Sequence, residues 1–371
     1  MIATSLTLTE FRNYADCSLE FDPGVNIICG ANAQGKTNLL EGLFFASNLK
    51  SFRSANKKDV IRMDRERMRL DLCFDAFQRE HTVELALPRQ GSLQMAADGV
   101  KKKRQYDLIG FFRTVLFCPE DLYLVREGAA ARRRFLDVAL CQLRPNYAKY
   151  LEEYQRLLQH KSKILKHAEE KPSLLLTLDD FTRRMAYIGS FLVRYRAYFI
   201  RKLEAYAAEM QLLMSGKNET LSLEYQTVST IADPLGSVKE IEAALLCHGE
   251  SHRAAEIAAK SCLSGPHKDD MAVLLNGVSA RGFGSQGQIR TAVLALKLSE
   301  REMFYQDSGE YPVLLLDDVL SELDGRRQDF VLNQIQGGQV FITCCEEEKF
   351  GDIRSGKRFF VESGQVFPGK S

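Results

Sequence analysis

The first hundred residues alternate apolar and polar positions in short segments that are separated by turn-forming residues. A period of two is typical of β-strands with one buried face. The segments predicted as strands are SLTLTEF, DCSLEF, VNIICG, MRLDLCF, HTVELALP and SLQMAADG. One amphipathic helix interrupts them, from about Lys36 to Leu49. We therefore predict a strand-rich N-terminal region that contains a single helix.

The hydrophobic pattern changes to helical spacing between about Asp121 and Ser215. Pro172 and its neighbours interrupt this long charged stretch, which favours an antiparallel helical hairpin with a loop near residues 171–176. Mixed segments follow Gly216, then a helix from about residue 287 to 306, a strand at QVFIT and a hairpin at KRFFVESGQVF. This order predicts one α/β domain built from both ends of the chain, with a helical insertion between them.

Composition narrows the class of protein only slightly. The chain has 371 residues, 45% hydrophobic and 27% charged, with a formal net charge of +1, as in ordinary globular proteins. It contains no apolar run long enough to span a membrane, and its first residues lack the layout of a signal peptide. The nine cysteines form no CxxC pair. We expect free thiols in a reducing cytoplasm and no membrane partner.

The stretch GANAQGKT fits the pattern G-x-x-x-x-G-K-[ST] between a predicted strand and a predicted helix. In this context we favour a phosphate-binding loop over a chance glycine-rich turn, since the glycines let backbone N–H groups and the helix N-terminus surround phosphates. Lys36 is expected to reach the β- and γ-phosphates of ATP. The predicted nucleotide-binding residues of this loop are Gly30, Ala31, Asn32, Ala33, Gln34, Gly35, Lys36, Thr37 and Asn38.

A second stretch, PVLLLDDVLSELD, begins with an apolar run and continues with acidic residues. Such a run indicates a central parallel strand buried on both faces, and ligands bind beyond the carboxyl ends of such strands. We predict that Asp317 binds Mg²⁺ together with Thr37, and that Asp318 orients the attacking water, with Lys36 as the other catalytic group. The alternative is that the two aspartates only cap a helix; the phosphate loop favours the nucleotide hypothesis.

The glycine-rich segment GFGSQGQ precedes a clear helix, and Ser285 three residues before Gln288 fits a capping box. The same turn could form a second anion site. With the phosphate loop and the Asp-ended strand it resembles the signature of ABC-type ATPases. That resemblance implies that the turn binds the γ-phosphate of ATP held by a second subunit, and that SELD lies at the same interface of a head-to-head dimer. The residues concerned are Ser285, Gln286, Gly287 and Gln288, and Ser321, Glu322, Leu323 and Asp324.

Six stretches together resemble the RecF family, relatives of SMC-type ATPases: FRNY, GANAQGKTNLLEGL, PEDLYLVREGAAARRRFLD, SGPHKDD, SQGQIRTAVLALKLSE and LLLDDVLSELD. The resemblance implies a P-loop ABC-type ATPase head, residues 1–120 and 255–371 with a β-rich lobe at about 60–105, and a helical arm, residues 121–254. It further implies slow, weak, DNA-stimulated ATP hydrolysis, ATP-dependent dimerisation and binding of duplex DNA or duplex–single-strand junctions. Expected partners are RecR, RecO and RecA at gaps, in repair, replication restart and the SOS response.

Three positions depart from the broader ABC pattern. Asp318 stands where most ABC proteins carry glutamate, which agrees with slow turnover because the shorter side chain reaches water less well. Thr343 and Cys344 stand where many have a histidine. No glutamine occurs near LFCPEDL, so either Glu120 or Asp121 is expected to replace it.

Other residues near these motifs have two interpretations. By the same resemblance Arg12 and Asn13 contact nucleotide, and Arg53 could reach phosphate; an exposed turn arginine is the alternative for Arg12. His267 is a lone histidine in GPHKDD, for which a structural role is favoured over a metal site.

DNA binding requires basic surface. Arg132, Arg133 and Arg134 are weaker candidates than the predicted phosphate contacts, and no basic stretch with interleaved aromatics was found, so contacts to the DNA backbone are expected. The predicted contacts are Lys101, Lys102, Lys103, Arg104, Lys57 and Lys58. The alternative function, a transporter-type ABC nucleotide-binding subunit, is disfavoured because a membrane partner needs no long charged helical hairpin.

Overall fold

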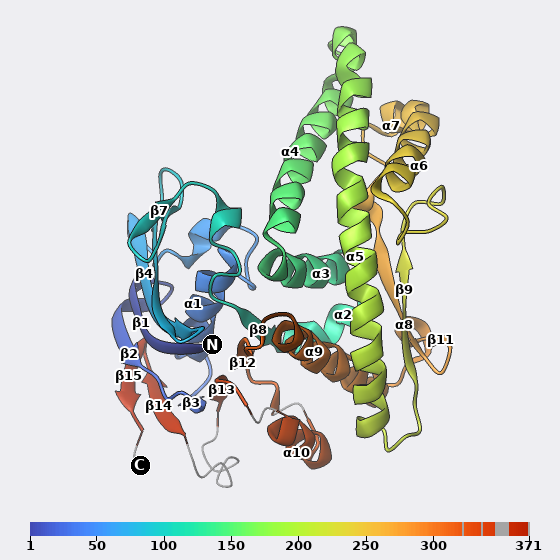
Figure 1. Cartoon of the computed structure of the whole chain (residues 1–371). Coiled ribbons are helices and arrows are strands. Elements are labelled where there is room, and N and C mark those ends of the chain that lie inside the picture. The colour runs from blue at the N-terminus through green and yellow to red at the C-terminus, as the bar shows by residue number, and fades with distance from the viewer. Residues whose placement is uncertain (321–322, 335–336, 346–355, 370–371) are drawn as a thin grey trace. The chain divides into compact units, whose positions relative to one another are not determined.

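The computed structural model describes residues 1–320, 323–334, 337–345 and 356–369. The chain forms two compact units, the first made of Met1–Leu122 and Val293–Ser371, the second of Tyr123–Ala292 (Figure 1). The first unit therefore joins both ends of the chain, as the order of predicted elements indicated. Among the described residues, no helix combines the length and apolarity that a membrane crossing requires.

The first unit contains an antiparallel sheet of six strands, in the order β2-β1-β4-β5-β6-β7. Its long strands alternate buried and exposed positions, because one face packs on the core. This confirms the strands predicted from the period of two. The strands are β1 (Ile2–Phe11), β2 (Tyr14–Glu20), β4 (Arg67–Ala76), β5 (Arg79–Pro88), β6 (Gln94–Ala97) and β7 (Val100–Lys102).

A second sheet in the same unit positions the predicted phosphate loop. Its order is β15-β14-β3-β13-β12-β8, and the pairs from β8 to β14 are parallel, whereas β15 is antiparallel to β14. All four residues of β12 are buried, which confirms a central strand covered on both faces. The strands are β3 (Val25–Cys29), β8 (Thr114–Phe117), β12 (Val313–Leu316), β13 (Val340–Cys344), β14 (Lys357–Glu362) and β15 (Gln365–Pro368).

Short helices connect these strands, and α1 directly follows β3. The long helix α9 begins in the second unit and ends in the first, since the boundary between the units falls at residue 293. The helical elements described in the first unit are α1 (Lys36–Asn48), η1 (Lys57–Val60), η2 (Gln105–Asp107), η3 (Pro119–Leu122), α9 (Gln286–Ser308, in part) and α10 (Gly325–Gln334).

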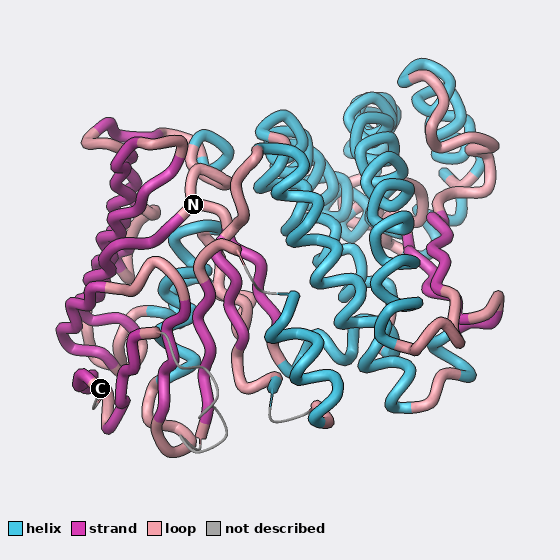
Figure 2. Tube along the Cα trace, turned by 60° about the horizontal axis from the view of Figure 1, so that its bottom comes forward, coloured by secondary structure: helices cyan, strands magenta, loops and turns pink. Residues whose placement is uncertain are grey.

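The second unit is mainly helical, with one small sheet in the order β11-β10-β9 (Figure 2). Its longest helices, α4 and α5, form the predicted hairpin, and a 3-10 turn occupies most of the predicted loop. The elements are α2 (Tyr123–Arg126), α3 (Ala129–Leu143), α4 (Pro145–His167), η4 (Pro172–Thr177), α5 (Leu178–Met214), β9 (Leu221–Gln226), α6 (Val238–Ser251), α7 (Arg253–Ala259), η5 (Pro266–Lys268), β10 (Asp270–Leu275), β11 (Val278–Ser279) and α8 (Ala280–Phe283).

The division between the units differs from the predicted one at its second boundary. We expected the arm to end at residue 254, but the second unit extends to Ala292. The physical reason is strand pairing, since β9 (residues 221–226) pairs antiparallel with β10 (residues 270–275). The chain after residue 254 therefore supplies a strand to the sheet of the second unit.

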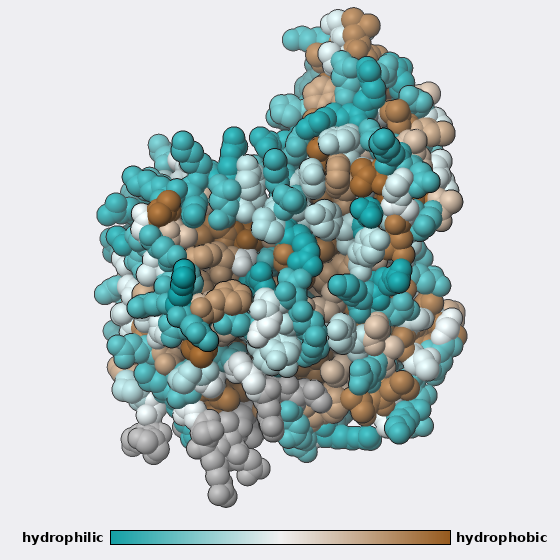
Figure 3. Space-filling view, in the orientation of Figure 1, coloured by the Kyte–Doolittle hydropathy of each residue, from teal (hydrophilic) through white to brown (hydrophobic). Residues whose placement is uncertain are grey.

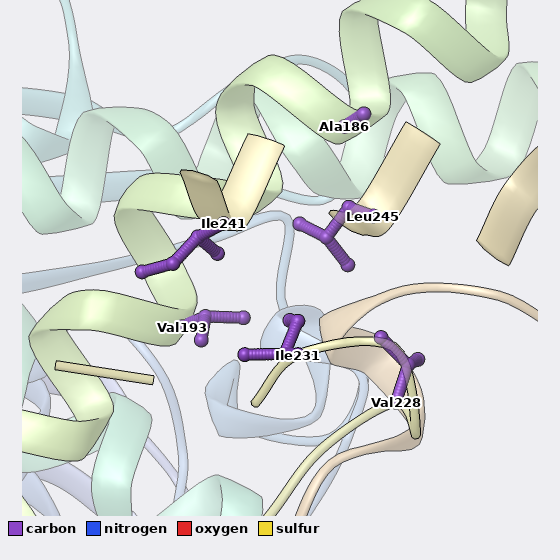
Figure 4. Packing of buried hydrophobic residues seen from close by; sticks show 6 residues of the cluster. All are labelled: Ala186, Val193, Val228, Ile231, Ile241 and Leu245. Carbon is purple, nitrogen blue, oxygen red and sulfur yellow. The ribbon is translucent and has the colours of Figure 1, made fainter. Parts of the chain in front are cut away.

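A compact apolar cluster holds α5, α6 and the segment after β9 together (Figure 4). Ala186 and Val193 lie seven residues apart on one face of α5, as the helical period requires. Burying each aliphatic side chain of this kind contributes about 1.5–3 kcal/mol. The other members of the cluster are Val228, Ile231, Ile241 and Leu245.

Candidate nucleotide-binding site

The phosphate loop runs from the end of β3 into α1 and depends on two glycines. Gly30 and Gly35 have φ values of 151° and 126°, which side chains rarely adopt. A Cβ atom at Gly30 would lie 2.3 Å from the carbonyl oxygen of Val361, and one at Gly35 would lie 2.7 Å from Nδ2 of Asn13. Both positions of the motif are therefore fixed by backbone conformation and by close neighbours.

Lys36, the first residue of α1, is almost fully buried. Its Nζ atom donates hydrogen bonds to the carbonyl oxygens of Gly30 at 2.6 Å and of Ala31 at 3.0 Å. The ammonium group thus lies inside the curve of the loop, next to the positive end of the helix. This arrangement is suited to the terminal phosphates of a nucleotide.

Side chains from other segments hold the loop in place. Asn13 donates from Nδ2 to the carbonyl oxygen of Gln34 at 2.8 Å, and its Oδ1 accepts from Nδ2 of Asn38 at 2.8 Å. The hydroxyl of Tyr14 donates to the carbonyl oxygen of Gly35 at 2.9 Å. The predicted residue Asn13 therefore braces both the loop and the helix that follows it.

A hydroxyl and a carboxylate meet at the predicted metal position. Thr37 Oγ1 and Thr343 Oγ1 each donate to Oδ1 of Asp317 over 2.9 Å. Burial raises the pKa of Asp317, partly opposed by these two hydrogen bonds. A buried carboxylate beside a threonine hydroxyl is the oxygen donor set that Mg²⁺ prefers. The residues present therefore fit Mg²⁺.

Two further acidic residues lie near Asp317. Asp318 follows it directly in a left-handed conformation, φ 52°, and its backbone N–H donates to Thr343 Oγ1 at 2.8 Å. The negative charge of Glu120 also contributes to the raised pKa of Asp317, whereas Asp121 accepts from the backbone N–H of Cys118 at 2.9 Å. Of the two candidates for the missing glutamine, Glu120 is exposed and its charge acts on Asp317, whereas Asp121 stabilises a turn.

The two predicted arginines have different surroundings. Arg12 forms a bidentate ion pair with the buried Glu41, at 2.6 and 2.8 Å, and also donates to the carbonyl oxygen of Asp59. Arg53 is half-exposed and donates to Oδ1 of Asn38 at 2.6 Å. Arg12 thus anchors its turn to α1, and Arg53 presents its guanidinium beside the loop.

These arginines line an open pocket of about 620 Å³ in the first unit. Asn13 and Asn38, which brace the phosphate loop, are among its lining residues, so the pocket lies beside the loop. Four of its ten lining residues are basic, which suits a negatively charged ligand. The lining residues are Arg12, Asn13, Asn38, Arg53, Asn56, Lys58, Asp59, Ile61, Met63 and Arg89.

The predicted signature turn lies in the second unit, at the start of α9. Ser285 Oγ accepts from the backbone N–H of Gln288 at 3.2 Å, and Gln288 Oε1 accepts from the N–H of Ser285 at 2.8 Å. This confirms the capping box. Ser285 and Gln286 are exposed, so the turn presents a helix N-terminus to solvent.

The predicted dimer loop is only partly described, since Ser321 and Glu322 lie outside the described residues. Leu323 is buried. Asp324 caps α10: its Oδ1 accepts from the backbone N–H of Arg327 at 3.0 Å, and the two side chains form an ion pair.

Some of the predicted DNA contacts are exposed, whereas others bind neighbouring side chains or line the pocket. Lys101, Lys103 and Arg104 are exposed, and Lys102 is half-buried, at the end of the antiparallel sheet formed by β6 and β7. Lys57 donates to Oε1 of Gln105 at 2.7 Å, whereas Lys58 lines the pocket described above.

The weaker DNA candidates Arg132 and Arg133 have structural partners in the second unit. Arg132 is buried and donates to both carboxylate oxygens of Asp270, at 2.6 and 2.9 Å. Arg133 donates to the carbonyl oxygen of Asp269. Arg132 is therefore not a surface group for phosphates, whereas Arg133 is half-buried.

His267 also has structural contacts, as favoured above. Its Nδ1 accepts from the hydroxyl of Tyr154 at 2.8 Å, which leaves Nε2–H to donate to the carbonyl oxygen of Cys262 at 3.2 Å. Burial lowers its pKa to about 4. In the described part of the chain, no group of three or more histidine, cysteine or acidic residues could hold a metal ion.

Sequence reasoning missed two residues of the site. Thr343 had been noted only as a departure from histidine, yet its hydroxyl joins Asp317 to the backbone of Asp318. Cys345 Sγ lies 3.6 Å from Lys36 Nζ and 2.9 Å from Asn32 Oδ1. Both follow from the position of β13 beside β12 and β3, and the rule that ligands bind at carboxyl ends of parallel strands could have indicated them.

Known proteins share this arrangement over almost the whole chain. The family model described as the RecF/RecN/SMC N terminal domain matches residues 2–366. The DNA replication and repair protein RecF of Listeria innocua serovar 6a is 40% identical over 369 residues, which cover 98% of this chain and 98% of that protein. The chain belongs to the RecF family. RecF of Lachnoclostridium phytofermentans is 37% identical over 371 residues, with 100% of each chain covered.

Solved structures agree with this assignment. A structure described as that of the recombination mediator protein RecF with ATPrS, in the RecFOR pathway, has a TM-score of 0.92 and 32% identity, covering 99% of this chain and 98% of that one. An Smc head domain from Pyrococcus furiosus has a TM-score of 0.56 at 14% identity, covering 100% of this chain and 96% of that one, which shows a shared fold. The resemblance to RecF and the ABC-type ATPase fold are therefore confirmed.

Proposed function

We propose that the chain is an ATP-dependent DNA-binding clamp that dimerises head to head on ATP and hydrolyses it slowly. The convergence of Lys36, Thr37 and Asp317 at the ends of parallel strands carries this proposal. A solved relative is named as a RecF–ATP complex in the RecFOR pathway. By analogy, RecR and RecO are the partners that act with the chain to load RecA at gaps.

The nucleotide is expected to extend from the phosphate loop into the adjoining pocket. Lys36 holds the terminal phosphates, Thr37 and Asp317 hold Mg²⁺, and Asp318 orients the attacking water. Bound by Thr37 and Asp317, Mg²⁺ would supply positive charge to the phosphates. Asn13, Asn38 and Arg53 then lie beside the inner phosphates and the ribose, because they form the wall next to the loop. Binding of the negatively charged nucleotide would account for the basic residues that line the pocket beside the loop.

The exposed turn at Ser285 supplies the proposed second half of the site. Its helix N-terminus carries a positive partial charge that attracts anions, and the resemblance to ABC-type ATPases implies that the γ-phosphate of ATP in a second subunit binds there. The exposed basic residues 101–104 of the first unit are the proposed DNA contacts, acting through the phosphate backbone. The transporter alternative is not retained, because the family is RecF.

Sedimentation with and without ATP and a gapped DNA tests this function. The wild type is expected to dimerise only with ATP, whereas Lys36→Ala and Ser285→Arg remain monomeric and lose ATP-dependent DNA retention. Ser251→Arg, at an exposed position of the second unit, is the matched control and is expected to behave as the wild type.

Mixing the two defective variants gives the sharper result. A mixed dimer would have two nucleotide sites. One of them would combine the intact phosphate loop of the Ser285→Arg subunit with the intact Ser285 turn of the Lys36→Ala subunit, so the mixture should regain part of the ATP-dependent dimer. No recovery in the mixture, or normal dimers of Ser285→Arg alone, would show that the turn is only a helix cap.

A further inference from the structure

The exposed face of α5 in the second unit is basic over most of its length. Between Phe181 and Leu203 the sequence contains six arginines and lysines and no acidic residue. One of them, Arg196, is buried. The other five lie within a single stripe of the helix, as their spacing of seven or eight and ten or eleven residues requires. They are Arg183, Arg184, Arg194, Arg201 and Lys202.

Two partly exposed tyrosines lie in the same stripe. Tyr187 is 37% exposed and Tyr198 is 43% exposed. Each has a guanidinium over its ring: Arg184 is 5.2 Å from the ring centre of Tyr187, and Arg194 is 5.3 Å from that of Tyr198. Flat rings and cations therefore alternate along one side of the helix. The space-filling view shows hydrophilic and hydrophobic residues mixed over the surface of the helical hairpin (Figure 3).

Packing behind the stripe fixes the first tyrosine. Tyr150 of α4 stacks on Phe191, with ring centres 4.4 Å apart and planes at 13°. The ring of Tyr187 meets Phe191 edge-on, at 5.3 Å and 81°. Tyr187 is thus held with part of its ring toward solvent, which reduces the entropy lost when a ligand stacks on it.

Some of the cations have intramolecular partners and others have none. Arg183 pairs with Asp180, and Arg184 pairs with Glu153 of α4. Within the described ranges, Arg194, Arg201 and Lys202 form no ion pair, although Nε of Arg194 is itself buried. The charge available to a ligand is therefore concentrated around Tyr198.

We propose that this stripe binds single-stranded DNA, with phosphates at Arg194, Arg201 and Lys202 and bases stacked on Tyr187 and Tyr198. The proposal rests on the proposed function and adds a second DNA surface to the one predicted in the first unit. Duplex DNA would use the cations but not the rings, because its bases are already stacked on one another. Exposed rings beside cations are the combination that single strands require.

The dimensions agree with a short stretch of single strand. Eleven residues separate the two tyrosines, which corresponds to roughly 16 Å along the helix. At about 3.4 Å per stacked nucleotide, this distance spans about five nucleotides. A single strand beside a gap could therefore lie along α5 and contact both rings.

Fluorescence anisotropy of the full chain with a labelled oligothymidylate and a labelled duplex tests the proposal. Tyr187→Leu/Tyr198→Leu keeps apolar side chains but removes the rings, and it is expected to weaken single-strand binding about 10-fold, since stacking contributes about 1–3 kcal/mol per base. Duplex binding should change by less than about 2-fold.

The charged part of the stripe is tested separately. Arg201→Glu/Lys202→Glu should weaken binding of both DNAs and reduce the salt dependence of single-strand binding by about 1.4 in log–log slope, as for two lost phosphate contacts. Lys163→Glu/Lys166→Glu makes the same charge change at exposed positions of α4, on a face away from Tyr150, and should have a clearly smaller effect.

Three outcomes would overturn the proposal: unchanged single-strand binding by the tyrosine variant, equal losses for duplex and single strand, or a loss of binding to poly-L-glutamate without a loss for DNA. The last would indicate a docking surface for an acidic protein. These titrations are done without ATP as well as with it. A chain that fails to dimerise on ATP would therefore refute the proposed clamp and leave the test of the stripe intact.

Discussion

The buried charges of the phosphate loop in the first unit and of one network in the second unit have different partners. In the second unit Arg196 is buried and forms ion pairs with Asp137 at 2.8 Å and Asp269 at 3.0 Å. Asp269 also accepts hydrogen bonds from the hydroxyls of Tyr225 and Thr227. We call these five residues the arm network. Its single cation forms ion pairs with both of its carboxylates.

Among the described residues, Lys36 and Asp317 at the phosphate loop form no ion pair. The recorded hydrogen bonds of Lys36 go to backbone carbonyl oxygens and a thiol, and those of Asp317 come from two hydroxyls. Burial raises the pKa of both Asp317 and Asp269. The degree of burial therefore does not distinguish the phosphate loop from the arm network. The difference lies in the partners: charges that meet opposite charges stabilise the fold, and charges that meet neutral groups remain available to a ligand.

The largest effect is expected at the loop, for Asp318→Asn. Removing a base that orients water typically slows a reaction by about 10²–10⁴-fold, while ATP binding should change little because the phosphate contacts remain. A phosphate-release assay and a nucleotide-binding titration measure the two effects. Asp318→Glu keeps the carboxylate and should retain hydrolysis. Normal hydrolysis by the asparagine variant would remove Asp318 from the chemistry.

Arg196→Met in the arm network is expected to lower the stability of the fold and to leave the nucleotide site unchanged. The change leaves two carboxylates without their cation, which typically costs about 3–5 kcal/mol of the free energy of unfolding. Urea denaturation measures this cost, and folded protein should still bind ATP. Arg183→Met, on the exposed face of the same helix, should cost less than about 1 kcal/mol. If the two variants were equally stable, the arm network would not be a structural element.

A smaller, pH-dependent effect is expected at His267, close to the arm network. The pKa of this histidine falls from 6.5 to about 4 because burial disfavours the charged form. The unfolded chain therefore binds the proton more tightly, and stability is lost as pH falls from 6.5 to about 4, by about 3 kcal/mol.

Denaturation at several pH values compares His267→Gln with the wild type. The variant should lose less stability across this interval, because glutamine does not titrate. His167→Gln, at an exposed position of α4, should follow the wild type. A wild-type curve that matches His267→Gln throughout would show that the histidine is not buried in its neutral form.

Much of the fold followed from local pattern. The strands, the helical hairpin and the capping box at Ser285 were predicted because their period, turn residues and spacing act over a few positions. The extent of the arm was not, since the partner of β9 lies more than forty residues further along the chain, at residues 270–275. Strand pairing over such distances leaves no local signal.

The stripe on α5 also could not be recognised from the order of residues in the sequence. No basic segment with interleaved aromatics stands out in sequence order, because Tyr187, Arg194 and Tyr198 are separated by buried residues. Only the helical period and the choice of buried face bring the rings and cations together. That choice is made by the contacts of α5 with α4 and α6.

The sequence by itself determined the phosphate loop, because two glycines, a lysine and a helix start act on adjacent residues. It also determined that β12 is a central strand ending in aspartates. The tertiary structure decided which group meets those aspartates: the hydroxyl of Thr343 donates to Asp317 and accepts from the backbone N–H of Asp318. It also decided that Arg196 of the arm network meets two carboxylates, those of Asp137 and Asp269. These pairings join residues from distant segments, and only the packed sheets and helices bring them within bonding distance.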